Sequence, residues 1–179
     1  MLDEVKLSTP PSHPDPRIRK RVFLSLGSNR GDRKGNLRRA LAELDNIGVS
    51  VQRVSSVYKT EPVDFEAQAW FLNMVVEAAT ELMPMQLLKA VKFVERTLGR
   101  RPGASKGPRP IDIDILLYEN AVVRRPELTI PHERMSERRF VLVPLAELVP
   151  AARHPVSKRT FSELLHDTAD SSRVLRYKE

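Results

Sequence analysis

The sequence has no cysteine, only seven glycines and one tryptophan, and no long apolar segment. Without cysteine the chain can form no disulfide, thiolate nucleophile or zinc–thiolate centre, which is typical of a reducing compartment. Its longest stretch without a charged residue covers residues 67–76, well short of the roughly 18 apolar residues that a membrane helix needs. Acids and prolines near the N-terminus leave no apolar signal core. We therefore expect a cytoplasmic protein that has no membrane partner.

The 179 residues predict one folded domain with tails. Residues 1–20 are rich in proline and are expected to form a flexible N-terminal tail. Residues 21–150 carry the apolar periodicity of the folded domain, and residues 151–179 are expected to form a small helix and a terminal tail.

Positive charge is in excess, with 30 lysines and arginines against 23 acidic residues. Residues 17–39 contain nine basic side chains and one acid, and residues 100–110 contain four basic side chains and no acid. Such clusters favour anionic ligands, either nucleic acid or the phosphates of a nucleotide. An ordinary solvated surface is the alternative for the first cluster.

Apolar periodicity predicts the element order βαββαβ. Strands are expected over residues 21–26, 49–60, 70–80 and 111–118. The first helix is expected to begin after an N-cap at Asn36, and the second to run from Pro84 to a stop at Gly99. This order is that of a ferredoxin-like α/β (α+β) sandwich, in which both helices cover one face of an antiparallel sheet.

Beyond Tyr118 the pattern is less regular. We expect a hairpin around Glu119 and Asn120, and then an apolar run over residues 140–149. These segments are expected to extend the antiparallel sheet as a C-terminal hairpin, followed by a helix around Phe161–Leu165 and a fraying tail.

Two aspartates alternate with three isoleucines in the last predicted strand. Side chains at i and i+2 of a strand share a face about 7 Å apart, so Asp112 and Asp114 point together. Their repulsion calls for compensation, and carboxylate ligands without cysteine or paired histidine indicate Mg²⁺. Two polar residues at a solvent-facing strand end are the alternative.

The loop before this strand strengthens the functional interpretation. Its glycines and basic side chains lead directly into the carboxylate pair, and cations beside metal-ready carboxylates are what phosphoryl transfer requires. The turn over residues 27–35 has neither the Walker spacing nor a dinucleotide fingerprint, so we assign it a structural role. Phe71 and Asn73 lie two residues apart on a predicted strand, which suits a flat ring with a polar edge as well as a core position.

Several motifs together resemble the 6-hydroxymethyl-7,8-dihydropterin pyrophosphokinase family of folate biosynthesis, over about residues 21–150. They are the Leu26-Gly-Ser-Asn turn, the segment Ser55–Pro62, Phe71-Leu-Asn73, the run Lys106–Ile115 with its Gly-Pro-Arg and Asp-x-Asp elements, and Pro131-His132 with Arg138 and Phe140. The resemblance implies a ferredoxin-like fold, and transfer of the β,γ-pyrophosphoryl group of ATP to the pterin hydroxymethyl oxygen with release of AMP.

The resemblance also implies roles for individual residues. Two Mg²⁺ ions would be held by Asp112 and Asp114, and catalysis would use these aspartates with Arg100 and Arg109. ATP would contact Glu95, Arg100, Lys106, Arg109, Ile115, Thr129, His132 and Arg138. The pterin would contact Thr60, Val63, Phe71, Asn73, Asp112 and Phe140.

Two other functions use related scaffolds. An RNA-binding module stacks bases on aromatic residues of its central strands, whereas the candidate strand here offers Asp112 and Asp114. A metal-dependent nucleotidyl transferase on a palm-like domain also presents paired carboxylates, but it releases pyrophosphate instead of AMP. We expect ATP and the hydroxymethyl dihydropterin as substrates, no nucleic-acid partner and a monomeric chain.

Overall fold

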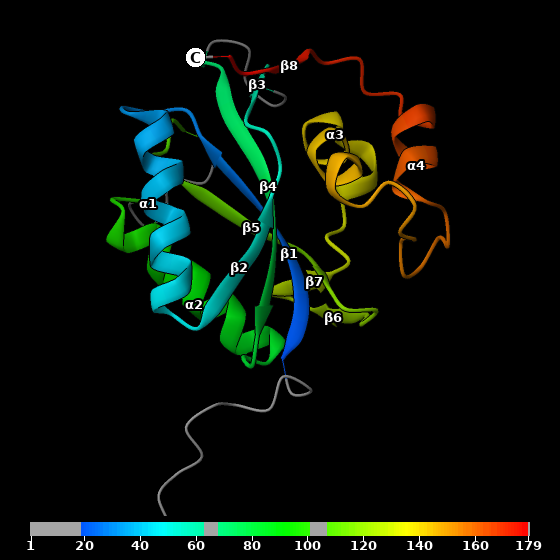
Figure 1. Ribbon diagram of the computed structural model, residues 1–179, viewed down its shortest axis with the longest axis horizontal. Coiled ribbons are helices and arrows are strands. Elements are labelled where there is room, and N and C mark those ends of the chain that lie inside the picture. The colour runs from blue at the N-terminus through cyan, green and yellow to red at the C-terminus, as the bar shows by residue number, and fades with distance from the viewer. Residues whose placement is uncertain (1–18, 63–67, 101–106, 179) are drawn as a thin grey trace, which may run out of the picture.

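A computed structural model describes residues 19–62, 68–100 and 107–178 of the chain (Figure 1). The elements are β1 (Lys20–Ser28), α1 (Arg33–Asn46), β2 (Val49–Val54), β3 (Tyr58–Thr60), β4 (Phe71–Thr80), α2 (Pro84–Thr97), β5 (Asp112–Tyr118), β6 (Val123–Arg125), β7 (Leu128–Ile130), a 3₁₀ turn (Met135–Glu137), α3 (Arg139–Leu148), α4 (Phe161–Asp167) and β8 (Val174–Arg176).

The main sheet is antiparallel and has the strand order β5-β1-β4-β3-β8, with β2 also paired to β4. Since β2 and β3 both pair with β4, the four predicted strands lie in the spatial order fourth, first, third, second. A strand–helix–strand unit repeated twice gives this order in the ferredoxin-like sandwich. The predicted fold class is confirmed.

Helices cover both faces of this sheet, α1 and α2 on one side and α3 and α4 on the other (Figure 1). Alternation along the strands divides the apolar side chains between the two cores. Leu24 and Leu26 of β1 pack with α1 and α2, whereas Phe23 packs with α3 and α4. Each fully buried leucine contributes about 1.5–3 kcal/mol to folding. The two cores therefore hold the sheet rigidly from both sides.

Helix α1 begins earlier than predicted. Asp32 is its N-cap and accepts a hydrogen bond from Gly35 N at 2.9 Å. Asn36, the expected cap, is instead buried inside the helix and donates to Ser28 Oγ and the Arg30 carbonyl. The prediction was wrong because an aspartate three residues before a backbone N–H supplies the better cap. Helix α2 begins at Pro84, and Gly99, with a φ of 95°, lies just past its end, as predicted.

The strand expected over residues 49–60 is two strands, β2 and β3. Between them Ser55 bonds to Val75 of β4 through both its backbone N and its hydroxyl group. This side-chain bond replaces a ladder bond and interrupts the strand. Both pieces nevertheless pair with β4, so the topology is unchanged.

The region after β5 differs most from the prediction. The hairpin is formed by β6 and β7, its turn lies at residues 126–127 instead of 119–120, and it makes a separate two-stranded sheet. The apolar run 140–149 is helix α3, and residues 174–176 of the supposed fraying tail form β8 on the edge of β3. A short apolar run has no period that separates a buried helix from a strand. Helix α4 occurs where a terminal helix was expected.

No helix within residues 19–62, 68–100 and 107–178 has the length and apolar character needed to cross a bilayer.

Candidate active site

The paired aspartates of β5 lie as the alternation predicts. Ile113 and Ile115 are buried in the core beneath α1 and α2, so Asp112 and Asp114 face the opposite side of the sheet. Burial, together with the neighbouring Asp112 carboxylate, raises the pKa of Asp114. A carboxylate with a raised pKa beside a second acid is a site where a cation is stabilising.

Arginine side chains from the loop before β5 surround Asp112. Arg100 contacts one Asp112 oxygen, and the Arg109 Nε lies 3.5 Å from the other. Arg100 also contacts Glu95 Oε1, so it bridges two carboxylates. The structure thus brings together three of the four residues predicted to act in catalysis, with Asp114 two positions along the strand.

Glu95 lies behind the site instead of facing open space. The residue is 1% exposed, and its Oε1 accepts a hydrogen bond of 2.7 Å from the backbone N of Ile113, which lies between the two aspartates. It also contacts Lys92 and Arg100. Burial raises the pKa of Glu95 despite these cations. The carboxylate therefore ties the end of α2 to β5 and orients Arg100.

Asn29, in the turn after β1, links the basic loop to the sheet. Its Oδ1 accepts from Arg109 N at 2.8 Å, its backbone N donates to the Arg109 carbonyl, and its Nδ2 donates to Gln68 Oε1. The sequence assigned no role to this turn beyond structure. Asn29 thus positions the backbone of Arg109, a role that the sequence analysis did not give it although it quoted the Leu26-Gly-Ser-Asn turn; an asparagine directly after a strand was the available signal.

A polar and aromatic group faces the same side of the sheet on β4 and β3. Asn73 Nδ2 donates to Thr60 Oγ1 at 2.6 Å, and both residues are buried. The Phe71 ring lies 5.8 Å from the Arg109 guanidinium. Phe140, at the start of α3, packs against the core on this side, and the Arg138 guanidinium lies 5.6 Å from its ring. Four of the residues predicted to contact the pterin therefore lie on the side of the sheet that carries Asp112 and Asp114.

Gly27 lies between the carboxylate–arginine group at Asp112 and the polar and aromatic group at Asn73. Its strand partners are Asn73 on β4 and Asp112 on β5, so the three residues form one row across the sheet. A Cβ at Gly27 would lie within 3.0 Å of Asn73 Oδ1 and 3.6 Å from the Phe71 ring. The glycine therefore allows the Asn73 amide to lie close against the backbone of β1. The sequence analysis included Gly27 in the Leu26-Gly-Ser-Asn turn but gave it no role in the site, because strand register is not readable from one strand.

A small pocket of about 280 Å³ opens beside the edge strand β5. Asp114, Ile115, Thr129 and His132 line it, together with residues of α2 and of the β6–β7 hairpin. Burial lowers the pKa of His132, which favours the neutral ring. Three residues predicted for ATP are thus adjacent to the carboxylate pair.

Two predicted contacts are not described. Val63, expected beside the pterin, and Lys106, expected beside ATP, lie outside residues 19–62, 68–100 and 107–178.

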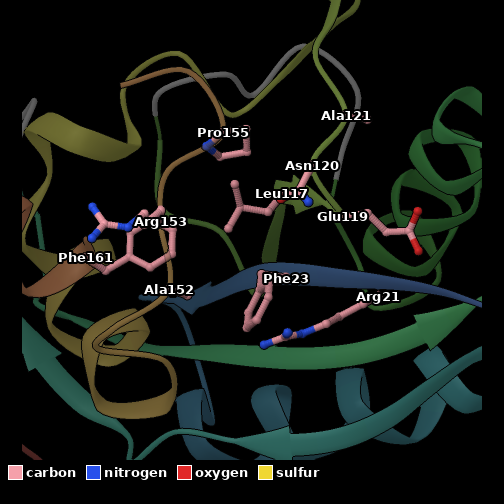
Figure 2. Close-up of a pocket in the computed structure, with 10 residues that line it drawn as sticks. All are labelled: Arg21, Phe23, Leu117, Glu119, Asn120, Ala121, Ala152, Arg153, Pro155 and Phe161. Atoms are coloured by element: carbon pink, nitrogen blue, oxygen red, sulfur yellow. The ribbon is translucent and has the colours of Figure 1, made fainter. Parts of the chain in front are cut away.

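A larger cavity, of about 710 Å³, lies elsewhere (Figure 2). Figure 2 shows Phe23 and Leu117 between the basic side chains Arg21 and Arg153. It contains none of the predicted site residues. Among the described residues no aspartate lines this cavity, so the site with the paired aspartates Asp112 and Asp114 is the better candidate for chemistry.

Known proteins resemble this chain over most of its length. Residues 23–150 match the family described as 7,8-dihydro-6-hydroxymethylpterin-pyrophosphokinase. A 2-amino-4-hydroxy-6-hydroxymethyldihydropteridine pyrophosphokinase of Bacillus subtilis is 48% identical over 128 residues, which are 71% of this chain and 77% of the relative. An enzyme of the same name from Aquifex aeolicus is 40% identical over 142 residues, 79% of this chain and 88% of the relative.

A solved structure shares the fold. The Plasmodium falciparum HPPK-DHPS triple mutant with pteroate superimposes with a TM-score of 0.66 at 16% identity, covering 83% of this chain and 43% of that one. This chain therefore spans less than half of that longer protein. With the family match over residues 23–150 and two bacterial relatives at 40% identity or more, the chain belongs to the 7,8-dihydro-6-hydroxymethylpterin-pyrophosphokinase family.

Proposed function

We propose that this protein transfers the β,γ-pyrophosphoryl group of ATP to the hydroxymethyl oxygen of 6-hydroxymethyl-7,8-dihydropterin in folate biosynthesis, with release of AMP. Family membership supports this reaction. One observation links this reaction to particular residues: the row Asn73–Gly27–Asp112 has, on one face of the sheet, an amide that we propose to bind the pterin ring and a carboxylate that two arginines contact.

Asp112 and Asp114 are proposed to hold two Mg²⁺ ions. Within the described part of the chain no three His, Cys, Asp or Glu side chains gather as a metal cage. A carboxylate pair nevertheless fits Mg²⁺, which keeps several waters and takes its other ligands from substrate phosphates. The raised pKa of Asp114 agrees with a place for a cation. When bound, the ions would neutralise phosphate oxygens and orient the triphosphate.

The nucleotide is proposed to lie along the edge of β5. Ile115, Thr129 and His132 line the pocket there, and the adenosine would pack against them. The charge of Arg138 partly offsets the rise in the Asp114 pKa, so Arg138 is near enough to the aspartates to favour a phosphate contact there. The sequence prediction for Lys106 is retained as a further phosphate contact.

Arg100 and Arg109 are proposed to meet the transferred phosphates. Both lie at Asp112, so a triphosphate at the carboxylates would come within reach of both guanidinium groups. Phosphoryl transfer is catalysed mainly by positioning and by charge neutralisation, and it requires no covalent intermediate here. Glu95, which stays buried, would keep Arg100 at the site when the phosphates draw it from Asp112.

The pterin is proposed to lie across Gly27. Asn73 and Thr60 would read its polar edge, Phe71 and Phe140 would stack on its faces, and Val63 is retained from the sequence prediction. This placement would direct the hydroxymethyl group toward Asp112, in line with the β-phosphorus. Holding the hydroxymethyl group in this orientation would lower the activation barrier of the transfer.

The test is to incubate the purified protein with ATP, Mg²⁺ and the hydroxymethyl dihydropterin and to separate the products. AMP and a pterin diphosphate are expected in equal amounts, and the Asp114→Asn variant is expected to form neither at a comparable rate. Pyrophosphate without AMP would indicate nucleotidyl transfer and would refute the proposal.

We also propose that the protein works in the cytoplasm as a monomer. The absence of cysteine supports a reducing compartment. Sedimentation at the mass of one chain is the expected result, and a dimer at micromolar concentration would contradict it.

A further inference from the structure

Residues 168–178, which we call the C-terminal strap, leave α4, pass α3 and end on β3 (Figure 1). They lie beyond residue 150, where the match to the family ends. The strap nevertheless touches the two elements that carry opposite walls of the proposed pterin site.

The first contact is at the start of α3. Helix α3 has no side-chain cap of its own at Arg138. Asp170 of the strap supplies one, because its Oδ2 accepts a hydrogen bond of 2.7 Å from Arg139 N. Its Oδ1 accepts from Ser172 N at 2.9 Å, which fixes the carboxylate. A carboxylate at a helix N-terminus also interacts favourably with the helix dipole.

This cap lies between two proposed ligand contacts. Arg139 is preceded by Arg138 and followed by Phe140. Burial opposes the charge of Asp170, but the bonds from Ser172 and Arg139 outweigh it and lower the pKa of this carboxyl group. The cap is therefore charged near neutral pH.

The second contact is at the edge of β3. Val174, Leu175 and Arg176 pair in antiparallel register with Thr60, Lys59 and Tyr58. Next to this ladder Glu61 N donates to the Arg173 carbonyl, and Arg173 Nε lies 2.7 Å from Glu61 Oε1.

Without β8, the backbone of Thr60 would be on an open sheet edge. Thr60 Oγ1 is the acceptor for the Asn73 amide, so the strap holds the backbone that carries this acceptor. The Arg173 guanidinium also lies 4.9 Å from the Trp70 ring, one residue before Phe71. The strap thus supports, from the outer edge of β3, the Thr60–Asn73 wall of the proposed pterin site.

We propose that the C-terminal strap is a positioning element that holds the Thr60–Asn73 wall and the Phe140 wall in register for the pterin. This inference rests on the proposed pterin site. The two contacts are separable: the β3 contact serves the pterin alone, whereas the Asp170 contact serves the pterin through Phe140 and the nucleotide through Arg138. An ordered pocket binds more tightly because less ordering is required on binding.

The test compares three variants of the full chain by calorimetry, with the hydroxymethyl dihydropterin and with a non-hydrolysable ATP analogue in Mg²⁺. A chain that ends at Ser172 retains Asp170 and the Ser172 N–H that fixes its carboxylate, and it loses β8. Its dissociation constant for the pterin is expected to rise on the order of tenfold, while that for the analogue changes less than about twofold. Asp170→Ala is expected to weaken both ligands. The control is Asp167→Ala, whose carboxylate pairs with Arg159 on the surface, and neither constant should change.

Arg173→Ala keeps the chain length and removes only the ion pair and the ring contact, so it serves if the shortened chain folds poorly. A few-fold rise in the pterin constant is expected. Unchanged pterin binding in Arg173→Ala, or equal losses for both ligands in the shortened chain, would overturn the inference. An unaltered protein that binds no pterin would refute the proposed site instead.

Discussion

Replacing Gly27 by alanine adds one methyl group at the centre of the proposed substrate row. The added Cβ would lie within 3.0 Å of Asn73 Oδ1, closer than real Cβ contacts allow. The backbone of Gly27 is not in the left-handed region, so the strand itself tolerates alanine. The strain therefore falls on the Asn73 side chain.

The Asn73 amide cannot move away from the added methyl group without losing its hydrogen bond to Thr60. Asn73 is 4% exposed, and its Nδ2 already lies 2.6 Å from Thr60 Oγ1, at the short end of hydrogen-bond distances. The methyl group pushes from the opposite side, so the amide must rotate and give up the bond to Thr60. Leaving buried polar groups unpaired costs about 1–3 kcal/mol. If the pterin relies on this amide, its affinity should fall by roughly 5- to 150-fold.

Calorimetry with the pterin and with a non-hydrolysable ATP analogue measures this effect. Gly27→Ala should weaken the pterin and leave the analogue within about twofold, and the matched change Gly107→Ala, whose Cβ meets open space, should affect the pterin little. In an Asn73→Ala background, Gly27→Ala should weaken pterin binding almost no further, because the clashing amide is gone. Equal losses for both ligands, or full additivity of Gly27→Ala and Asn73→Ala, would refute the reasoning.

Three further predictions concern other parts of the molecule. Asp114→Asn should lower the rate of AMP formation at least about a hundredfold with an unchanged circular dichroism spectrum, because it removes the charge of a proposed Mg²⁺ ligand; near-normal turnover at limiting Mg²⁺ would contradict this. Glu95→Gln should leave the free energy of unfolding in urea within about 1 kcal/mol of the unaltered protein, because burial opposes the charge of Glu95 and Arg100 keeps its contact with Asp112; a loss of several kcal/mol would contradict this. Burial lowers the pKa of His154 below its ordinary 6.5, so below pH 6.5 the unfolded chain binds a proton that the folded chain does not. Stability should therefore fall as the pH drops from 6.5 toward the folded pKa, and His154→Gln should flatten this part of the profile.

The sequence predicted local features best. Alternation along one strand correctly placed Asp112 and Asp114 on one face, and helical periodicity found α1 and α2 because their apolar stripes are long. The run over residues 140–149 is ten residues of mostly apolar character, and it became helix α3 because that shape covers the second face of the sheet.

Features that depend on several strands were not readable. Gly27 matters only because β4 and β5 place Asn73 and Asp112 beside it, and Asn29 matters only because the loop at Arg109 folds back onto it. Strand β8 is three residues long with two of them exposed, so it lacks the apolar alternation that marks a strand. Its position on the β3 edge depends on contacts with residues distant in the sequence.

The row Asn73–Gly27–Asp112 across β4, β1 and β5 sets a fixed distance between the two ends of the proposed substrate site. Adjacent strands lie about 4.8 Å apart, so the backbone that carries Asn73 and the backbone that carries Asp112 are separated by about 10 Å, with Gly27 of β1 between them. Hydrogen bonds of the sheet fix this length, and no side-chain rearrangement can alter it. In the proposed site, a pterin held at Asn73 would have to place its reacting oxygen across that distance, and an analogue with a longer or shorter arm is expected to bind yet remain unreactive.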